Sequence, residues 1–400
     1  MSFHFPFSRR TDWDLSPNAI MKVREELRAE GAPILDLTES NPTRCQFEYG
    51  NNELLKAFAD PQALSYDPHS QGLLATREAI ARMYVAWGFT IDPANIFLTS
   101  STSEAYAHVF KLLLNSGEHL LLPQPSYPLF QYLADLSDVR TDYFPLEYKE
   151  GEWRVNFAEF IDLLAKDTKA VILVNPNNPT GSYIHPEDKE HVDKICAQRN
   201  IAVISDEVFW EFPLNSNIDI KKRSMLSGMK SLTFVLGGLS KTLGLPQMKL
   251  SWIILSGDEE VVKEARCRLE MIVDTFLSVN TPVQRAAITW LAQKETIQGE
   301  ILKRVQSNYR FLQAQVKNLK SVRLLEAQGG WYAVLSIPTT KSEEQWVLKL
   351  LSKYHVFVHP GYFFDFPGEA FIVVSLLTPQ PIFQEGIERA LSRIEQEQAS

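Results

Sequence analysis

Short apolar runs alternate with segments of helical period over the first 240 residues of the chain. The runs at 96–99, 119–123, 170–174, 201–205 and 233–238 are four to six residues long and rich in valine, isoleucine and leucine. Between them lie stretches such as 104–114 and 185–199, which have the length and composition of helices. This alternation is typical of βαβ units around a mostly parallel sheet that helices cover on both faces. The pattern therefore predicts an α/β fold.

The pattern changes after about residue 280. Long helices are predicted over 281–319, with a break near Lys294, followed by strands at 322–325, 331–337, 356–358 and 370–376 and a closing helix from about Pro381. Runs of strands and helices in this order indicate a smaller α+β domain packed on the α/β one.

The N-terminal segment carries one clear helix signal. Ser16 is a candidate N-cap, Pro17 suits the first helical position, and Gly31 is a candidate C-terminal cap. We expect this segment to complete the small domain. The large domain then covers residues 45–285, and the small domain covers 1–44 and 286–400, a division that suits a chain of 400 residues.

Composition limits the environment and the partners of the chain. Hydrophobic residues make up 45% of the sequence and no apolar run reaches the roughly 18 residues of a membrane-spanning helix. The opening MSFHFPFSRR places its aromatic residues before its arginines, which is the wrong order for a secretory signal. We therefore expect a cytoplasmic protein with no membrane partner.

Charge and cysteine content narrow the possibilities further. A net charge of -9 argues against a nucleic-acid partner, because proteins that bind phosphate backbones usually present a basic face. Cys45, Cys196 and Cys267 lie far apart and do not have the spacing of metal ligands. We expect three reduced thiols and no metal site.

Polar residues follow the predicted strands of the large domain. Ligands of parallel α/β sheets bind beyond the carboxyl ends of the strands, so these positions are candidates for a site. Alone, each could be a helix cap, a turn residue or an exposed amine, but their joint occurrence in this order indicates one ligand site. They are the hydroxyl run 99–103 at the start of a helix that could hold a phosphate, Asn177 and Asn178, Asp206, and Ser240 with Lys241.

Three motifs identify the family that the chain resembles. They are NPNNPTG at 175–181, SDEVFW at 205–210, and Ser240-Lys241 followed eight residues later by Lys249. Weaker matches are YDPHSQG at 66–72 and PSYPLF at 125–130. From Leu37 to the closing helix the chain resembles the class I and II aminotransferases, fold-type I enzymes of the aspartate-aminotransferase kind that use pyridoxal 5'-phosphate. The resemblance implies a three-layer αβα large domain with a smaller α+β domain.

The resemblance also implies roles for individual residues. Lys241 would form a Schiff base with the cofactor and then move a proton, Asp206 would face the pyridine nitrogen, and Asn178 would donate a hydrogen bond to the ring's phenolic oxygen. Tyr127 would stack on the ring. The phosphate would be held by Ser101, Thr102, Ser103, Lys249 and, from a second subunit of a homodimer, Tyr66.

The sequence departs from the family pattern at four positions. Phe209 stands where a tyrosine is usual, Ser101 replaces a glycine, and Lys249 replaces an arginine. Val373 stands where the family places the arginine that binds the substrate's α-carboxylate, and there is no arginine between Arg323 and Arg389. The lost charged hydrogen bonds should weaken amino-acid binding by an order of magnitude or more.

Arg44 is the candidate replacement for that arginine, with an ordinary surface arginine as the alternative. In similar enzymes the segment that contains Ser40, Asn41 and Arg44 lines the substrate side of the cleft. Trp331, Tyr332 and Phe364 are further candidates for shaping the substrate pocket.

The resemblance implies an aminotransferase that moves an amino group from an amino acid to a 2-oxo acid by a ping-pong mechanism. The same scaffold also runs other reactions, so two alternatives remain open. One is a pyridoxal-phosphate-dependent lyase acting by β-elimination, or an enzyme for amines without an α-carboxylate. The other is a non-catalytic sensor that binds the cofactor.

Overall fold

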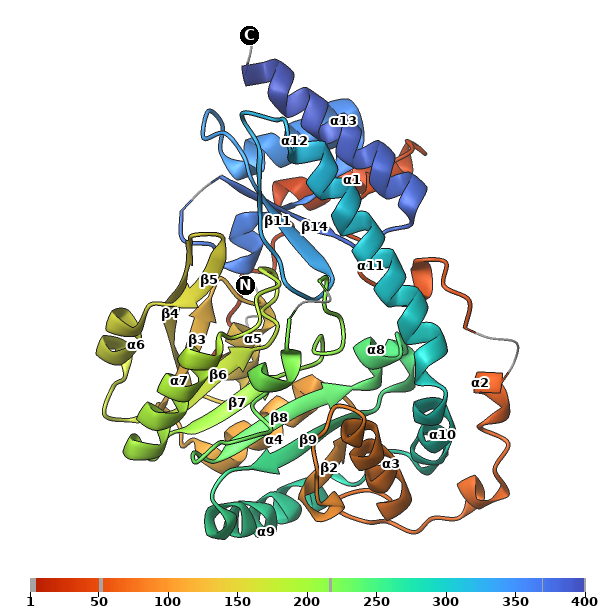
Figure 1. Cartoon of the computed structure of the whole chain (residues 1–400), viewed down its shortest axis with the longest axis vertical. Helices are drawn as coiled ribbons and strands as arrows, with labels where there is room; N and C mark the ends of the chain where they lie inside the picture. The colour runs from red at the N-terminus through yellow and green to blue at the C-terminus, as the bar shows by residue number, and fades with distance from the viewer. Residues whose placement is uncertain (1–4, 50–52, 216–217, 369, 399–400) are drawn as a thin grey trace.

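The computed structural model describes residues 5–49, 53–215, 218–368 and 370–398. It contains a large β-sheet, a small one and a two-stranded one (Figure 1). The large sheet lies in the lower half of Figure 1, and the small sheet lies above it beside the C-terminal helices. This arrangement confirms the predicted α/β fold with a second, α+β part.

The large sheet has eight strands in the order β2-β9-β8-β7-β6-β3-β4-β5. The strands are β2 (Ile96–Thr99), β3 (His119–Gln124), β4 (Arg140–Lys149), β5 (Glu152–Val155), β6 (Thr168–Val174), β7 (Ala202–Asp206), β8 (Thr233–Gly238) and β9 (Ser251–Ser256). All neighbours pair in parallel except that β9 is antiparallel to β2 and β8, and β5 to β4. The five apolar runs of the sequence are all strands here, as predicted.

Helices cover both faces of the large sheet. One face packs against α4 (Thr102–Leu113), α5 (Leu129–Leu136) and α9 (Glu259–Phe276). The other packs against α3 (Leu74–Val85), α6 (Phe157–Leu163), α7 (Pro186–Arg199) and α10 (Thr281–Ala292). Alternate residues of the central strands enter these two cores, for example Ile172 one core and Val171 the other. Burial on both faces explains why these strands are apolar throughout.

The small sheet has four antiparallel strands in the order β10-β11-β14-β13. They are β10 (Arg323–Leu325), β11 (Tyr332–Ser336), β14 (Phe371–Ser375) and β13 (His359–Pro360). One face packs into a second core with α11 (Lys294–Val316), α12 (Glu343–Tyr354) and α13 (Gln380–Gln398). Since side chains alternate along a strand, Tyr332, Val373 and His359 lie on the opposite face.

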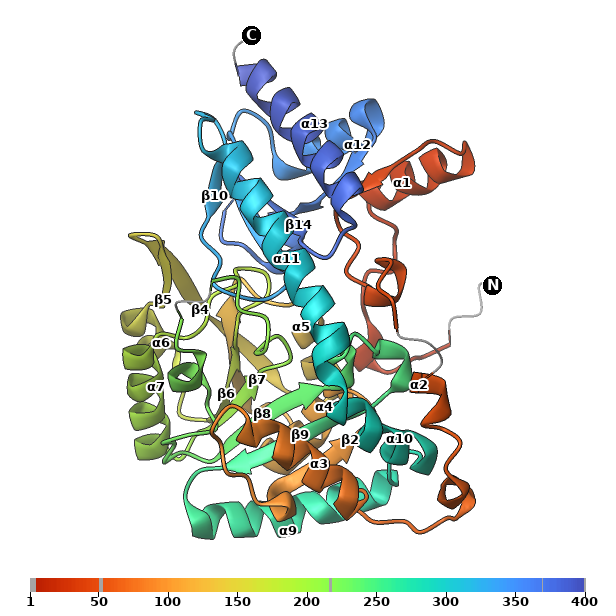
Figure 2. The same cartoon turned by 45° about the vertical axis from the view of Figure 1, so that its right-hand side comes forward.

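The N-terminal segment joins the small sheet's side of the molecule. Its helix α1 (Ala19–Ala29) lies beside α12 and α13 in Figure 2, and β1 (Leu35–Asp36) pairs in parallel with β12 (Val356–Phe357). Two further α-helices have four residues each, namely α2 (Glu53–Lys56) and α8 (Leu239–Thr242). The domain limits at residues 44/45 and 285/286 stay a prediction.

The helix ends differ from the prediction at α1. The N-cap is Asn18, whose side chain accepts a hydrogen bond from the Met21 N–H, and not Ser16. Ser16 instead donates from its hydroxyl to Asp14. Asparagine and serine are equally good N-caps, so the sequence alone offered two starting points. The predicted break near Lys294 is confirmed, because α10 ends at Ala292 and α11 begins at Lys294.

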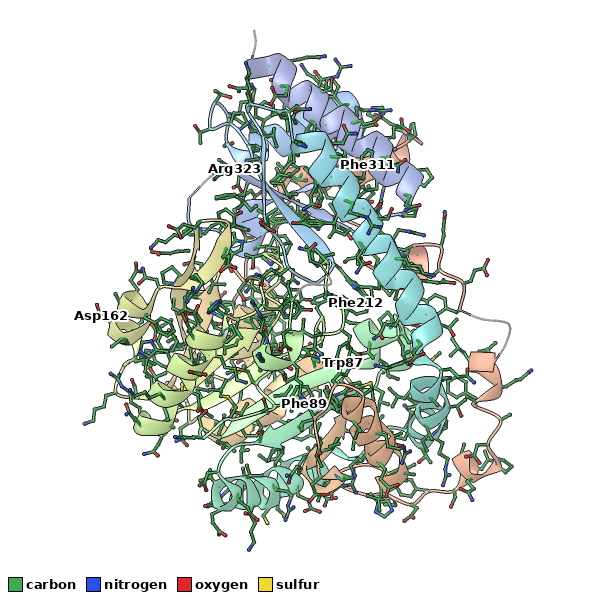
Figure 3. The ribbon with its side chains drawn as sticks, in the orientation of Figure 1. Trp87, Phe89, Asp162, Phe212, Phe311 and Arg323 are labelled. Atoms are coloured by element: carbon green, nitrogen blue, oxygen red, sulfur yellow. The ribbon has the colours of Figure 1, made fainter. Side chains whose placement is uncertain are left out.

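The loop after β7 connects the large sheet to the second core. Phe209, Phe212 and Leu214 belong to that core, and Phe212 is labelled between the two parts in Figure 3. The Leu214 N–H donates to the Gln328 carbonyl at 2.9 Å, and the Gly330 N–H donates to the Phe212 carbonyl at 2.9 Å. These bonds fix the β10–β11 loop against the carboxyl edge of the large sheet.

None of the helices in the described ranges combines the length and the apolarity that a bilayer span requires.

Candidate active site

A cavity of about 330 Å³ lies between the carboxyl edge of the large sheet and the outer face of the small sheet. Five of the predicted residues reach it from the ends of five different strands: Thr102 after β2, Tyr127 after β3, Asn178 after β6, Asp206 at the end of β7 and Lys241 after β8. Ser40 joins them from the N-terminal segment. The polar residues that follow the predicted strands in the sequence thus line one cavity in the structure.

Lys241 lies in α8, and its amine is in an apolar environment. The amine is 5.3 Å from the ring centre of Phe209 and 4.9 Å from that of Trp331. Burial lowers the pKa of Lys241 to about 8, although the Asp206 carboxylate opposes this shift. An amine with such a pKa is partly neutral near pH 7, so it can act as a nucleophile and as a proton carrier.

Asp206 is buried at the end of β7. Its carboxylate accepts hydrogen bonds from the Tyr106 hydroxyl at 3.1 Å and from the Val208 N–H at 3.1 Å. Burial raises the pKa of Asp206 to about 6, against the effect of these two bonds and of Lys241. The carboxylate is therefore ionised at neutral pH and can hold a cation in the cavity. Tyr106 was not predicted, because it occupies an apolar position inside α4 that carries no motif.

The NPNNPTG turn leaves Asn178 available to the cavity. Asn177 holds the turn: its side-chain oxygen accepts from the Thr180 hydroxyl at 2.9 Å, and its carbonyl accepts from the Gly181 N–H at 2.8 Å. The side-chain oxygen of Asn178 is buried without a hydrogen-bond partner among the described residues. A buried polar atom of this kind usually has a ligand or water as its partner.

The N-terminus of α4 lies at one end of the cavity. The Ser101 hydroxyl caps this helix by accepting from the Glu104 N–H at 3.1 Å, and Thr102 lines the cavity. Ser103 is exposed and does not line it. Lys249 is also exposed, has a left-handed backbone with φ of 53°, and lies outside the lining.

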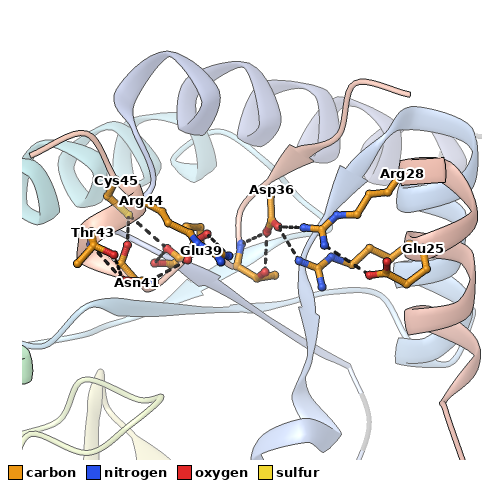
Figure 4. A network of polar contacts seen from close by, with 11 residues as sticks. Glu25, Arg28, Asp36, Glu39, Asn41, Thr43, Arg44 and Cys45 are labelled. Carbon is orange, nitrogen blue, oxygen red and sulfur yellow. Dashed lines mark hydrogen bonds and ion pairs between the residues drawn. The ribbon is translucent and has the colours of Figure 1, made fainter. Parts of the chain in front are cut away.

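The remaining predicted residues do not reach the cavity of their own chain. Tyr66 is 76% exposed. The Asn41 side chain caps a short turn by accepting from the Thr43 N–H at 3.1 Å. Arg44 has a 72% exposed side chain, with its guanidinium 3.9 Å from the Glu39 carboxylate (Figure 4). Of the 40–44 segment, the structure brings Ser40 alone to the cavity.

The small-sheet side of the cavity is aromatic. Tyr332 and Phe364 line it as predicted, and Ser40 lies in the same lining. Phe363 and His359 also line it and were not predicted. The available signal was weak: His359 is a polar residue just after the apolar run 356–358.

Comparisons with known proteins agree with this geometry. A sequence model of the family described as aminotransferase class I and II matches residues 33–389. The glutamate-pyruvate aminotransferase AlaA of Haemophilus influenzae is 27% identical over 373 residues, which cover 89% of this chain and 90% of that protein. The alanine aminotransferase of Mycobacterium tuberculosis is 26% identical over 353 residues, 86% of this chain and 81% of that protein.

Solved structures share the fold. An alanine aminotransferase from Pyrococcus furiosus superimposes with a TM-score of 0.86 at 24% identity, covering 98% of this chain and 100% of that one. An aspartate aminotransferase from Thermotoga maritima superimposes with a TM-score of 0.81 at 22% identity, covering 98% and 100%. At this identity the likeness establishes the architecture and leaves the substrate open.

Proposed function

Because the chain belongs to the class I and II aminotransferases, enzymes that use pyridoxal phosphate, we propose that Lys241, Asp206 and Asn178 hold this cofactor in the cavity. The observation that supports the assignment most directly is the placement of a lysine amine with a pKa of about 8 and a carboxyl with a pKa of about 6 in one cavity. Strongly shifted groups that share a cavity are typical of active sites.

The residues present fit the cofactor. When bound, it supplies an aldehyde that takes up the amino group and a ring that accepts electrons from the substrate carbon. The Lys241 amine anchors the aldehyde and, once released, carries a proton on its Nζ. The ionised Asp206 would keep a proton on the ring nitrogen, because a carboxylate attracts a cation more strongly in a buried site than in water. Asn178 lines the cavity, and its side-chain NH2 would donate a hydrogen bond to the ring oxygen.

Two aromatic residues define the walls around the ring. Tyr127 lines the cavity and would stack on the bound ring. Phe209 lines it without offering a hydroxyl, so the ring oxygen lacks a hydrogen bond of about 1 kcal/mol compared with the family pattern.

We assign the cofactor's phosphate to the N-terminus of α4. This helix is 12 residues long, and its first turn offers free N–H groups and the hydroxyls of Ser101, Thr102 and Ser103. Lys249, which lies outside the cavity lining, would add a positive charge as a single donor rather than a bidentate fork.

The family implies an amino acid and a 2-oxo acid as substrates. We propose that the two react in turn at the same cavity, so that the first product leaves before the second substrate enters. The shape of the cavity determines which amino acid and which oxo acid can bind and react.

Borohydride labelling tests the assignment. It reduces the bond between a lysine and the cofactor, and peptide mapping should find the label on Lys241. Lys241→Ala should take up no label and lose activity, whereas Lys263→Ala, which removes an exposed lysine of α9, should behave like the native protein. A label on any other lysine would contradict the proposal.

We further propose that two copies of the chain form a two-fold dimer that shares its active sites. Segment 55–74 carries four exposed large apolar side chains, namely Leu55, Leu64, Tyr66 and Leu74. An apolar surface of this kind is typical of an interface. In Figure 1 this segment runs along the outer edge of the molecule between α2 and α3. A second copy packed there would bring Tyr66 to its partner's phosphate site.

A further inference from the structure

We propose that His359 binds the substrate's α-carboxylate, in place of the arginine that the family carries at position 373. This inference rests on the proposed function and names the side chain that selects its substrates.

The pairing of β13 with β14 puts His359 beside position 373. His359 and Val373 are directly opposite each other in this antiparallel ladder. Opposite residues project from the same face of a sheet, with Cβ atoms about 4.5–5.5 Å apart. The His359 imidazole therefore projects from the outer face of the small sheet, which faces the cavity. It lies on the strand next to the one that carries position 373.

Position 373 cannot itself receive a carboxylate. Val373 is fully buried in an apolar cluster with Trp153, Val334, Phe364 and Phe366. None of these side chains carries a charge, and of the cluster only Phe364 lines the cavity. A carboxylate there would lose its hydration without replacement.

His359 has hydrogen-bonding capacity that the protein leaves unused. The centre of its ring lies 5.7 Å from the ring centre of Phe363 and 5.8 Å from that of Phe364. These phenylalanine rings pack against the imidazole and offer it no hydrogen-bonding group. Its Nδ1 atom is buried without a partner among the described residues. A polar side chain that lines a cavity and has an unpartnered nitrogen is suited to a ligand with a hydrogen-bonding group.

Few alternatives could hold an anion in this cavity. Within the described part of the chain, Lys241 and His359 are the lining side chains that can carry positive charge. Lys241 is committed to the cofactor, and Arg44 lies beside Glu39 outside the lining. The Ser40 and Tyr332 hydroxyls can contribute as neutral donors.

The charge state of His359 determines how firmly it holds a carboxylate. Burial lowers the pKa of His359 to about 4; Asp36 opposes this shift and Arg24 adds to it. The imidazole thus meets a ligand as a neutral N–H donor, and an incoming carboxylate favours the protonated ring. Recognition should therefore be weaker than by arginine, with apolar contacts to the aromatic walls supplying the remaining affinity.

Equilibrium binding of two matched probes tests the proposal on the cofactor-loaded protein. The probes are 3-phenylpropionate and its neutral amide, whose phenyl group suits the aromatic lining. Calorimetry should show about tenfold preference for the acid, a factor that corresponds to about 1.4 kcal/mol. His359→Leu should abolish the preference, and His359→Gln, which keeps an N–H donor, should restore part of it. His191→Leu, which removes an exposed histidine of α7, should leave it unchanged.

Kinetics separate substrate binding from a structural role. His359→Leu should raise the KM for L-phenylalanine at least tenfold, change kcat less than threefold, and leave the KM for phenethylamine, which has no carboxylate, unaltered. A parallel loss with both substrates would show that His359 only supports the fold. The proposal would also be overturned if the native protein bound the amide as tightly as the acid, or preferred the amine, because the site would then take substrates without a carboxylate.

Borohydride labelling of each variant tests the cofactor site separately from the carboxylate-binding role of His359. A normal label on Lys241 with unchanged acid binding in both His359 variants would refute this inference alone. Absence of the label from the native protein would refute the proposed function.

Discussion

Lys241 and Asp206 are two ionisable groups placed where water is largely excluded. Burial favours the neutral form of each, and so the pKa of the amine falls to about 8 and that of the carboxyl rises to about 6. Both groups are largely charged at neutral pH in spite of this preference. They therefore lower the stability of the cofactor-free protein, and a cofactor that binds them as proposed would offset this loss.

Asp206→Asn should stabilise the cofactor-free protein in a pH-dependent way. A carboxyl whose pKa is higher in the folded protein than in the unfolded chain stabilises the fold at low pH, and this contribution is lost as the pH rises through 6. The variant should be more stable than the native protein by about 1–3 kcal/mol at pH 8, with no advantage below about pH 4. Urea unfolding at both pH values measures this.

If Asp206 faces the ring nitrogen as proposed, the same variant should bind the cofactor less tightly, because an amide cannot stabilise the protonated ring. An equal stability difference at pH 8 and pH 4 would show that the Asp206 carboxyl is not the titrating group.

These site residues could be predicted because each follows a parallel strand. Ligands bind beyond the carboxyl ends of such strands, and this rule is enough to expect Asn178, Asp206 and Lys241 in one cavity from the sequence alone. No comparable rule covers the antiparallel small sheet, so His359 was missed. Tyr106 was missed because it resembles any apolar helix position until the fold places it beside Asp206.

At the scale of elements, backbone hydrogen bonds join the turn after β6 to the loop between β10 and β11. The Gly181 carbonyl accepts from the Gln328 N–H at 2.9 Å and from the Gly329 N–H at 2.8 Å. Gly181 has φ of +69°, and a Cβ atom there would lie 2.6 Å from the Gly329 carbonyl oxygen. The final glycine of NPNNPTG is thus required by the neighbouring loop as well as by the turn.

Gly181→Ala should therefore destabilise the protein by about 2–4 kcal/mol, through backbone strain and the displaced loop. Gly117→Ala is the matched control: its φ is +83°, but nothing lies within 4 Å of the added methyl group, so about 1 kcal/mol is expected. Urea unfolding of both variants measures the difference. Equal losses would mean that the β10–β11 loop moves away without cost.

The start of α11 is fixed to the loop after β7 by a buried ion pair. Lys294 donates to Glu211, which also accepts from the Trp87 indole at 2.9 Å. Lys294→Met leaves the carboxylate buried without its cation and should cost about 3–5 kcal/mol of stability. Adding Glu211→Gln should recover part of the loss, measured by urea unfolding. A double variant as unstable as the sum of the single ones would show that the two side chains do not interact.

Strand prediction succeeded at the five apolar runs of the large sheet and missed its strands β4, β5 and β9. The edge pair β4 and β5 alternates between apolar and polar residues, and its half-buried residues resemble a surface loop in sequence. β9 is fully buried over most of its length but runs antiparallel between two parallel strands, which the βαβ pattern does not anticipate.

At the scale of the whole molecule, the proposed dimer makes a prediction about mixed subunits. A hybrid of a Lys241→Ala subunit and a Tyr66→Phe subunit has one site with an intact Lys241. If Tyr66 reaches the partner's phosphate, that site also receives an intact Tyr66 and should bind the cofactor with native affinity. Refolding an equal mixture and titrating the cofactor by absorbance measures this.

If Tyr66 acts within its own chain, the hybrid site keeps the weakened affinity of Tyr66→Phe. Sedimentation of the native protein as a monomer would exclude shared sites altogether.

Helix α11 runs from α10 and α8, beside the large sheet, to the level of α13 (Figures 1 and 2). Near its start Gln298 donates to the Thr242 carbonyl, one residue from Lys241, while Val305 and Leu312 lie in the second core. If either the large-sheet part or the small-sheet part unfolds, helix α11 loses its contacts with that part. Heating in a calorimeter should give one sharp endotherm, and two separated peaks would mean that the halves melt independently.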